Sequence, residues 1–231
     1  MNSVIVSAYY RIPSKQPHEF YVPHLKRFLS GIENFIVFFT EPELVEEFSK
    51  LRGNLPIQFV TDFDIFKKRN RQFWERQCLL DCEKYHTPEL GAIWYNKKEF
   101  VLRSIDLIGK DVPYIWCDAG CIRFDQDVKS FGTHVEKVPK DKLLLQSFHE
   151  KLLDEKFFRF PFICIAGAII AGYTESWKNM STLYDEMVDK YDMNNISCNS
   201  DQYILSSLVK KYPKLFKLIL VKDWFDLLQV L

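Results

Sequence analysis

Short apolar segments alternate with segments of helical spacing along the first quarter of the chain. Residues 4–10 are rich in β-branched and aromatic side chains, and residues 34–39 and 57–60 repeat this composition. Between these runs, residues 20–30 and 43–51 carry apolar side chains at near-helical spacing, with charged residues among them. The pattern predicts strand, helix, strand, helix and strand in succession.

The same pattern continues less regularly through the rest of the chain. We expect one or two helices within residues 64–85, helices over 92–108, 174–191 and 200–211, and strands over 114–117, 143–146 and 162–171, followed by a terminal apolar segment. Alternating strands and helices favour an α/β fold with a Rossmann-like, mostly parallel central sheet flanked by helices. Ligands of such sheets bind at the carboxyl ends of strands, so polar side chains that follow a strand are the first candidates for a site.

Composition is compatible with a single domain over residues 1–231. Hydrophobic side chains make up 47% of the sequence, and with only 8 glycines and 10 prolines there is no evident linker, repeat or low-complexity tract. Lys plus Arg and Asp plus Glu number 31 each, and this balance argues against nucleic acid as a partner. No apolar run is long enough to span a membrane, and residues 4–6 begin a first strand and not a secretory signal, which predicts a cytoplasmic protein.

Six cysteines stand at positions 78, 82, 117, 121, 164 and 198. Two pairs are four residues apart, but neither forms a CxxC turn, and no histidine accompanies them at zinc-finger spacing. We therefore expect reduced, buried thiols and not a zinc site.

The most informative stretch is residues 114–120, where an apolar strand ends in Asp118. A carboxylate there could hold a divalent cation that orients the phosphates of a nucleotide, and the structural alternative is a cap on the following turn. Gly120 would let a ligand approach the backbone closely. Of two literal Asp-x-Asp strings, residues 62–64 follow a strand and could contact a nucleotide or metal, whereas residues 125–127 fit a solvated turn.

Further candidates lie on other segments. Asp201 and Gln202 begin a helical segment and could bind acceptor hydroxyls, with Asp201 as a general base. An ordinary helix start, with Ser200 or Asn199 as N-cap and an acid that suits the helix dipole, explains them as well. Gly167, in a stretch of small residues, would let a sugar lie against the backbone, and close packing is the alternative. Lys97 could offset phosphate charge, or it could be a surface lysine.

Several segments, taken in order, resemble the HtrL/YibB-like family, whose members are similar to GT-A glycosyltransferases. The resemblance rests on residues 4–11, 36–41 and 93–97, on Trp-Cys-Asp-Ala-Gly at 116–120, Ala-Gly at 166–167 and Ser-Asp-Gln at 200–202. It implies one GT-A-like domain, with a nucleotide-sugar-binding half over residues 1–125 and an acceptor-binding half over residues 126–231.

The resemblance also implies roles for individual residues. A divalent cation, Mn²⁺ or Mg²⁺, would bind at Asp118, although Gly120 stands where the Asp-x-Asp pattern has its second carboxylate. Asp201 would be catalytic. The implied contacts are Ala8, Tyr9, Arg11, Lys97, Asp118, Ala119, Gly120 and Gly167 for the donor, and Asp201, Gln202 and Trp224 for the acceptor, with core packing as the alternative for Trp224.

The sequence therefore predicts a glycosyltransferase that moves a sugar from a nucleotide sugar, in the first instance a UDP-sugar, to a hydroxyl of a glycan or glycoconjugate. The missing second carboxylate at Gly120 leaves open a catalytically inactive module that binds nucleotide sugars or glycans. A nicotinamide-dependent oxidoreductase is disfavoured, because the turn after the first strand, residues 7–10, contains no GxGxxG.

Overall fold

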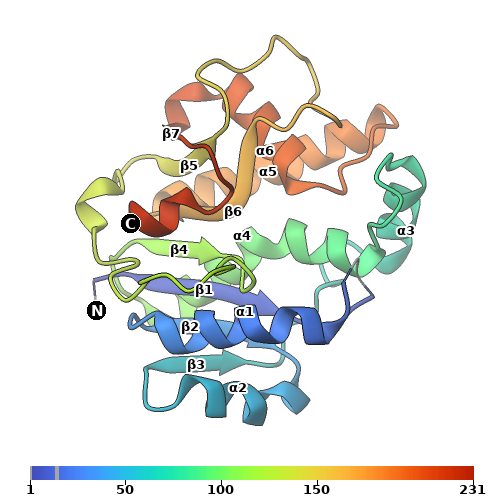
Figure 1. Cartoon of the computed structure of the whole chain (residues 1–231). Coiled ribbons are helices and arrows are strands. Elements are labelled where there is room, and N and C mark those ends of the chain that lie inside the picture. Colours follow the sequence, from blue (N-terminus) through green and yellow to red (C-terminus); the bar gives the residue numbers. More distant parts are fainter. Residues whose placement is uncertain (1, 14–15) are drawn as a thin grey trace.

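The computed structural model describes residues 2–13 and 16–231, which form one seven-stranded sheet with helices packed against it (Figure 1). The strands lie side by side in the order β3-β2-β1-β4-β6-β5-β7. Their bounds are β1 Val4–Tyr9, β2 Ile36–Thr40, β3 Ile57–Val60, β4 Tyr114–Cys117, β5 Leu143–Ser147, β6 Ile165–Gly172 and β7 Phe216–Leu220.

Most strands of the sheet run in one direction. β3, β2, β1 and β4 pair in parallel, β6 is antiparallel to its neighbours β4 and β5, and β7 is parallel to β5. The predicted mostly parallel sheet is therefore confirmed. Because β1 and β4 are parallel neighbours, with Val6 opposite Trp116, the segments that follow Tyr9 and Cys117 emerge at the same edge.

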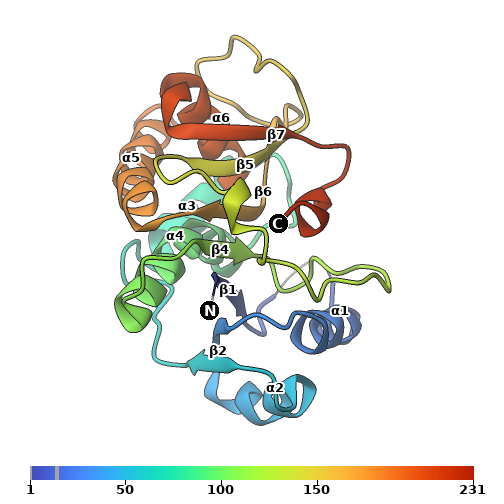
Figure 2. The same cartoon turned by 90° about the vertical axis from the view of Figure 1, so that its left-hand side faces the viewer.

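Helices cover both faces of the sheet, as Figure 2 shows. Side chains alternate along β1, so that Val4 and Val6 belong to the core layer beneath α4, α5 and α6, whereas Ile5 belongs to the layer beneath α1 and α2. The helix bounds are α1 His18–Gly31, α2 Val45–Arg52, α3 Arg71–Leu80, α4 Pro88–Ile108, α5 Thr174–Met193 and α6 Asp201–Lys211.

The structure defines two segments that the sequence pattern described only loosely. Within residues 64–85 only Arg71–Leu80 is α-helical, because turns occupy much of the rest; one of them is fixed by Asp64, whose carboxylate accepts a hydrogen bond from the backbone of Phe66. The terminal apolar segment forms β7 and then a short 3-10 helix, η4, over Asp226–Gln229. That helix brings the end of the chain back against the α1 side of the sheet.

The six cysteines are free thiols. Four of them are buried, but Cys78 is only partly buried and Cys82 is exposed, so the expectation of burial does not hold for the whole set. Separately, no helix within residues 2–13 and 16–231 combines the length and the apolar character that crossing a membrane requires.

Candidate active site

A cleft opens where the segments after β1 and β4 meet. Its first cavity has a volume of about 680 Å³, a size common among small-molecule sites. The strand arrangement thus brings together the start and the middle of the chain. The walls include seven of the residues predicted for the donor: Ala8, Tyr9, Arg11, Lys97, Asp118, Ala119 and Gly120.

A second cavity of about 800 Å³ adjoins the first. Its walls include the three residues predicted for the acceptor, Asp201, Gln202 and Trp224. The two cavities therefore form a continuous cleft with a common wall. The residues shared by both are Tyr85, Trp94, Lys97, Asp118, Arg123 and Phe225.

Lys97 lies at the centre of this common wall. Its ammonium nitrogen is 3.1 Å from Asp118 Oδ1, 2.7 Å from Asp201 Oδ2 and 2.9 Å from the carbonyl oxygen of Gly167. The ammonium therefore donates a hydrogen bond to the Gly167 carbonyl and forms ion pairs with both carboxylates. The alternative that Lys97 is a surface lysine is wrong, because the inner face of α4 buries its side chain almost completely.

The two carboxylates differ in their access to solvent. The side chain of Asp118 is 36% exposed and faces the cleft, whereas that of Asp201 is 4% exposed. Burial raises the pKa of Asp118, against the opposing effect of the Lys97 ammonium. Burial lowers the pKa of Lys97, but the two carboxylates outweigh it and leave that pKa raised, so Lys97 is charged at neutral pH.

Asp201 owes its position to Gly167 and to the start of α6. Asp201 is the first residue of α6, and Ser200 at the N-cap position makes no side-chain capping bond. The expected capping bond from Ser200 is therefore absent, and Asp201 is an acidic residue in the first turn of α6. A Cβ on Gly167 would lie 2.1 Å from Asp201 Oδ2, so the glycine makes room for this carboxylate. Gly167 lines neither cavity, and its contact with Asp201 accounts for the small residue.

Other candidates from the sequence lie outside the cleft or have partners within the fold. Asp62 is highly exposed and 3.8 Å from Arg103, outside both cavities. Asp125 pairs with Arg27 at 2.7 Å on the surface, as expected for a solvated turn. Trp224 lines the second cavity while its ring packs edge-on against Phe148, with the ring centroids 4.7 Å apart.

Asp118 is a poor site for the divalent cation that the resemblance implies. Such cations take several oxygen ligands. Asp118 Oδ1 already accepts a hydrogen bond from Trp116 Nε1 and pairs with the Lys97 ammonium, Gly120 offers no side chain, and Asp201 Oδ2 pairs with the same ammonium. A cation that bound to Asp118 Oδ1 or to Asp201 Oδ2 would have to displace the buried Lys97. With one partly available carboxylate and no second oxygen ligand from Gly120, these donor atoms do not fit a divalent ion.

Among the described residues, one group of three metal-binding side chains lies close enough to share an ion, namely Asp81, Glu83 and His86. Hydrogen bonds account for its core: His86 Nδ1 is 2.5 Å from Asp81 Oδ2, and Asn199 Nδ2 donates to the same oxygen at 3.0 Å. The His86 ring packs edge-on against Trp94 of the cleft wall. The group thus ties the loop before α4 to the segment that precedes α6.

Sequence reasoning missed four residues of the common wall. Arg123 follows Asp118 by five positions, and Trp94 precedes Lys97 by about one helical turn. Those spacings were signals that could have pointed to both residues. Tyr85 and Phe225 lie in turns without a periodic pattern, so the sequence alone offered no signal for them.

The fold is that of GT-A-like proteins. The structure resembles mouse xyloside xylosyltransferase 1 in its apo form, with a TM-score of 0.55 and 11% sequence identity, covering 93% of this chain and 84% of that one. It also resembles CMP:2-keto-3-deoxy-manno-octonic acid synthetase in complex with CTP, with a TM-score of 0.50 and 11% identity, covering 96% and 91% of the two chains. At such identities the likeness concerns the fold alone.

The chain belongs to the family described as "Bacterial protein of unknown function (HtrL_YibB)", whose model matches residues 77–231. Protein HtrL of Escherichia coli strain K12 is 25% identical over 224 residues, covering 86% of this chain and 77% of the relative. The family resemblance drawn from the sequence is confirmed. The matched residues include Lys97, Asp118, Gly167 and Asp201.

Proposed function

We propose that this chain is a glycosyltransferase that moves a sugar from a nucleotide sugar, with UDP-sugars as the first candidates, to a hydroxyl of a glycan or glycoconjugate. One observation supports the proposal above the others: a buried ammonium, Lys97, joins Asp118 on the donor side of the cleft to Asp201 on the acceptor side. The GT-A-like fold and a cleft of two adjoining cavities are consistent with a donor and an acceptor that meet at this cluster.

The proposed reaction is a substitution at the anomeric carbon of the donor sugar. The acceptor hydroxyl oxygen forms a bond to this carbon, and the bond from the carbon to the phosphate oxygen breaks. The nucleoside diphosphate leaves with the electron pair of the broken bond, and the hydroxyl proton passes to a carboxylate. Positioning of the two substrates and stabilisation of the leaving charge supply most of the catalysis.

Each polar residue of the cluster has a role in this proposal. Asp118, the more exposed carboxylate, binds hydroxyls of the donor. Asp201 binds the acceptor hydroxyl and takes its proton, with Gln202 and Trp224 lining the acceptor side. Lys97 holds both carboxylates in place, since its ammonium forms ion pairs with both of them and donates a hydrogen bond to the Gly167 carbonyl.

The proposal is tested with a panel of UDP- and GDP-sugars. We expect at least one donor to bind in calorimetry and to be hydrolysed slowly, with faster release of the nucleoside diphosphate when a mixture of acceptors is present. Asp118→Asn should weaken donor binding, and Asp201→Asn should abolish turnover while donor binding remains. Asp62→Asn, at an exposed position outside the cleft, is the matched control.

Two outcomes would contradict the proposal in different ways. If no nucleotide sugar binds, the chain does not use nucleotide sugars at this cleft. If a donor binds but no acceptor mixture ever produces turnover, the chain is the inactive binding module that the glycine at position 120 leaves open.

A further inference from the structure

The Lys97 cluster does not supply the positive charge that a leaving diphosphate requires. Lys97 carries one positive charge, and Asp118 and Asp201 carry two negative charges between them. A nucleoside diphosphate adds further negative charge to the same cleft. Because the donor atoms at Asp118 do not fit a divalent cation, another cationic group has to face the phosphates.

Among the described residues of the cleft wall, Arg123 is the arginine or lysine that is not paired with a carboxylate. Arg11 also lines the first cavity, but its guanidinium is 3.4 Å from Glu47, and Lys97 is held by two carboxylates. Within residues 2–13 and 16–231, no carboxylate lies within ion-pair distance of Arg123, and its buried Nε has no hydrogen-bond partner there. Few protein contacts therefore compete with a ligand for this guanidinium, whose side chain lines both cavities.

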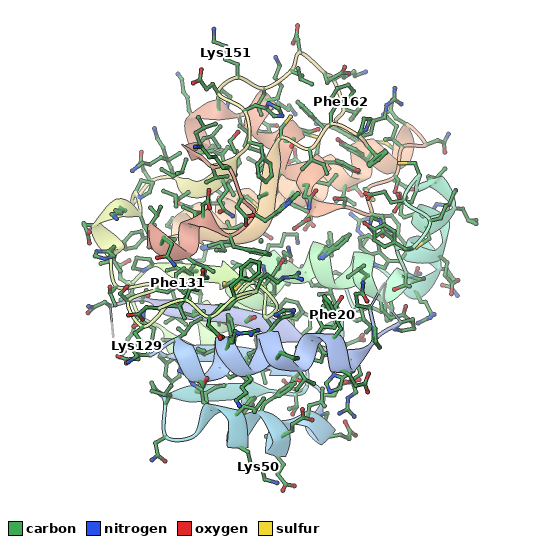
Figure 3. The ribbon with its side chains drawn as sticks, viewed as in Figure 1. Phe20, Lys50, Lys129, Phe131, Lys151 and Phe162 are labelled. Carbon is green, nitrogen blue, oxygen red and sulfur yellow. The ribbon has the colours of Figure 1, made fainter. Side chains whose placement is uncertain are left out.

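Two aromatic rings hold Arg123 at the junction of the cavities. The guanidinium carbon is 6.0 Å from the ring centroid of Phe20, which is labelled on α1 in Figure 3, and 5.6 Å from that of Phe225. Arg123 and Asp118 line both cavities. Burial lowers the pKa of the nearby His24, and the charge of Arg123 lowers it further. His24 is therefore uncharged at neutral pH, and Arg123 carries the positive charge at this point of the wall.

We infer that Arg123 binds the diphosphate of the donor and takes the place of a divalent cation, so that the proposed transfer needs no metal ion. The inference rests on the proposed function and assigns to it the group that binds the leaving phosphates. A planar guanidinium donates two parallel hydrogen bonds to phosphate oxygens. As the bond from the sugar to the phosphate breaks, its electron pair moves onto the phosphate oxygen, and Arg123 stabilises that charge without giving up a proton.

The test measures binding of UDP and GDP by calorimetry, in EDTA and in Mn²⁺, with uridine and guanosine as probes that lack phosphate. We expect the wild-type protein to bind one diphosphate equally well in both media, within about twofold. Arg123→Gln should weaken diphosphate binding by about 10- to 100-fold and leave nucleoside binding unchanged, because it removes charge-assisted hydrogen bonds to phosphate alone. Arg123→Lys should bind the diphosphate with an affinity between those of the wild type and Arg123→Gln. A lysine keeps the positive charge but cannot donate the two parallel hydrogen bonds of a guanidinium.

The control is Arg103→Gln, which removes an arginine paired with the exposed Asp62 outside the cleft and should leave binding unchanged. Because Arg123 has no ion pair to lose, Arg123→Gln should melt close to the wild-type temperature. Equal diphosphate binding by Arg123→Gln and wild type, or binding that appears only with Mn²⁺, would overturn the inference while the proposed function stands. If the wild type binds neither diphosphate and no nucleotide sugar, both the inference and the proposed function are contradicted.

Discussion

Two neighbouring lysines on α4 are both buried, both paired with two carboxylates, and placed in different surroundings. Lys97 bridges Asp118 and Asp201 on the wall of the cleft. Lys98 is 2.6 Å from Glu99 and 2.9 Å from Asp185, lines neither of the two large cavities, and has its ammonium 4.3 Å from the ring centroid of Tyr95. The ion pairs of the two lysines are alike, but the carboxylates paired with Lys97 line the cleft and those paired with Lys98 do not.

This comparison separates an ion pair that joins helices from one that serves a site. The carboxylate of Asp185 comes from α5, so the Lys98 cluster ties α4 to α5. The Lys97 cluster joins the end of β4, the start of α6 and a β6 carbonyl, and the carboxyl end of a strand such as β4 is where ligands bind in α/β sheets. A buried ion pair is therefore weak evidence for function until the solvent access of its members is known.

The largest effect on stability is expected when the ammonium charge of Lys97 or that of Lys98 is removed. Lys97→Gln and Lys98→Gln should each lower the free energy of unfolding, by up to about 3–5 kcal/mol, because each leaves carboxylates without their cation. Only Lys97→Gln should also weaken donor binding, since only Lys97 positions Asp118. Urea unfolding and calorimetry of the folded variants measure both quantities. An equal loss of donor binding in Lys98→Gln would show that Lys97 has no special role at the donor site.

A steric change at Gly167 sharpens the same distinction. Gly167→Ala places a Cβ 2.1 Å from Asp201 Oδ2 and should move this carboxylate away from Lys97, which lowers turnover by about 100-fold while donor binding persists. The control is Gly172→Ala on the same strand, where the new Cβ meets the side chain of Leu143 away from both cavities, so the rate per folded molecule should stay at the wild-type level. Steady-state rates with donor alone and with acceptor distinguish the two variants. Normal turnover in Gly167→Ala would remove Asp201 from the mechanism.

The smallest effect is expected from alkaline pH. The pKa of Lys97 is raised in the folded state above its ordinary value of 10.5. Stability contributed by the protonated amine is therefore fully present below pH 10.5 and is lost as the pH rises through the folded-state pKa. The difference in unfolding free energy between wild type and Lys97→Gln should stay constant up to pH 10.5 and become smaller as the pH rises through the folded-state pKa of Lys97. A difference that narrows already near neutral pH would mean that Lys97 is not held by both carboxylates.

Much of the fold could be predicted from the alternation of apolar runs and helical spacing. The strand over residues 114–117 and the helical segment near residue 201 placed Asp118 and Asp201 as candidates, because strand ends and helix starts are readable in sequence. The burial of Lys97 could not be predicted from the sequence, because a lysine on a helix is usually exposed. The reason for Gly167 depends on Asp201, which is distant in sequence and reaches it only through tertiary packing.

The crystal structure of the protein with a bound UDP-sugar tests the central claim most directly. The account predicts a donor whose diphosphate lies within hydrogen-bond distance of Arg123 and whose sugar lies between Asp118 and Asp201, with Lys97 still bonded to both carboxylates. A nucleotide sugar bound away from this cleft, or one held through a metal ion that displaces Lys97, would contradict it.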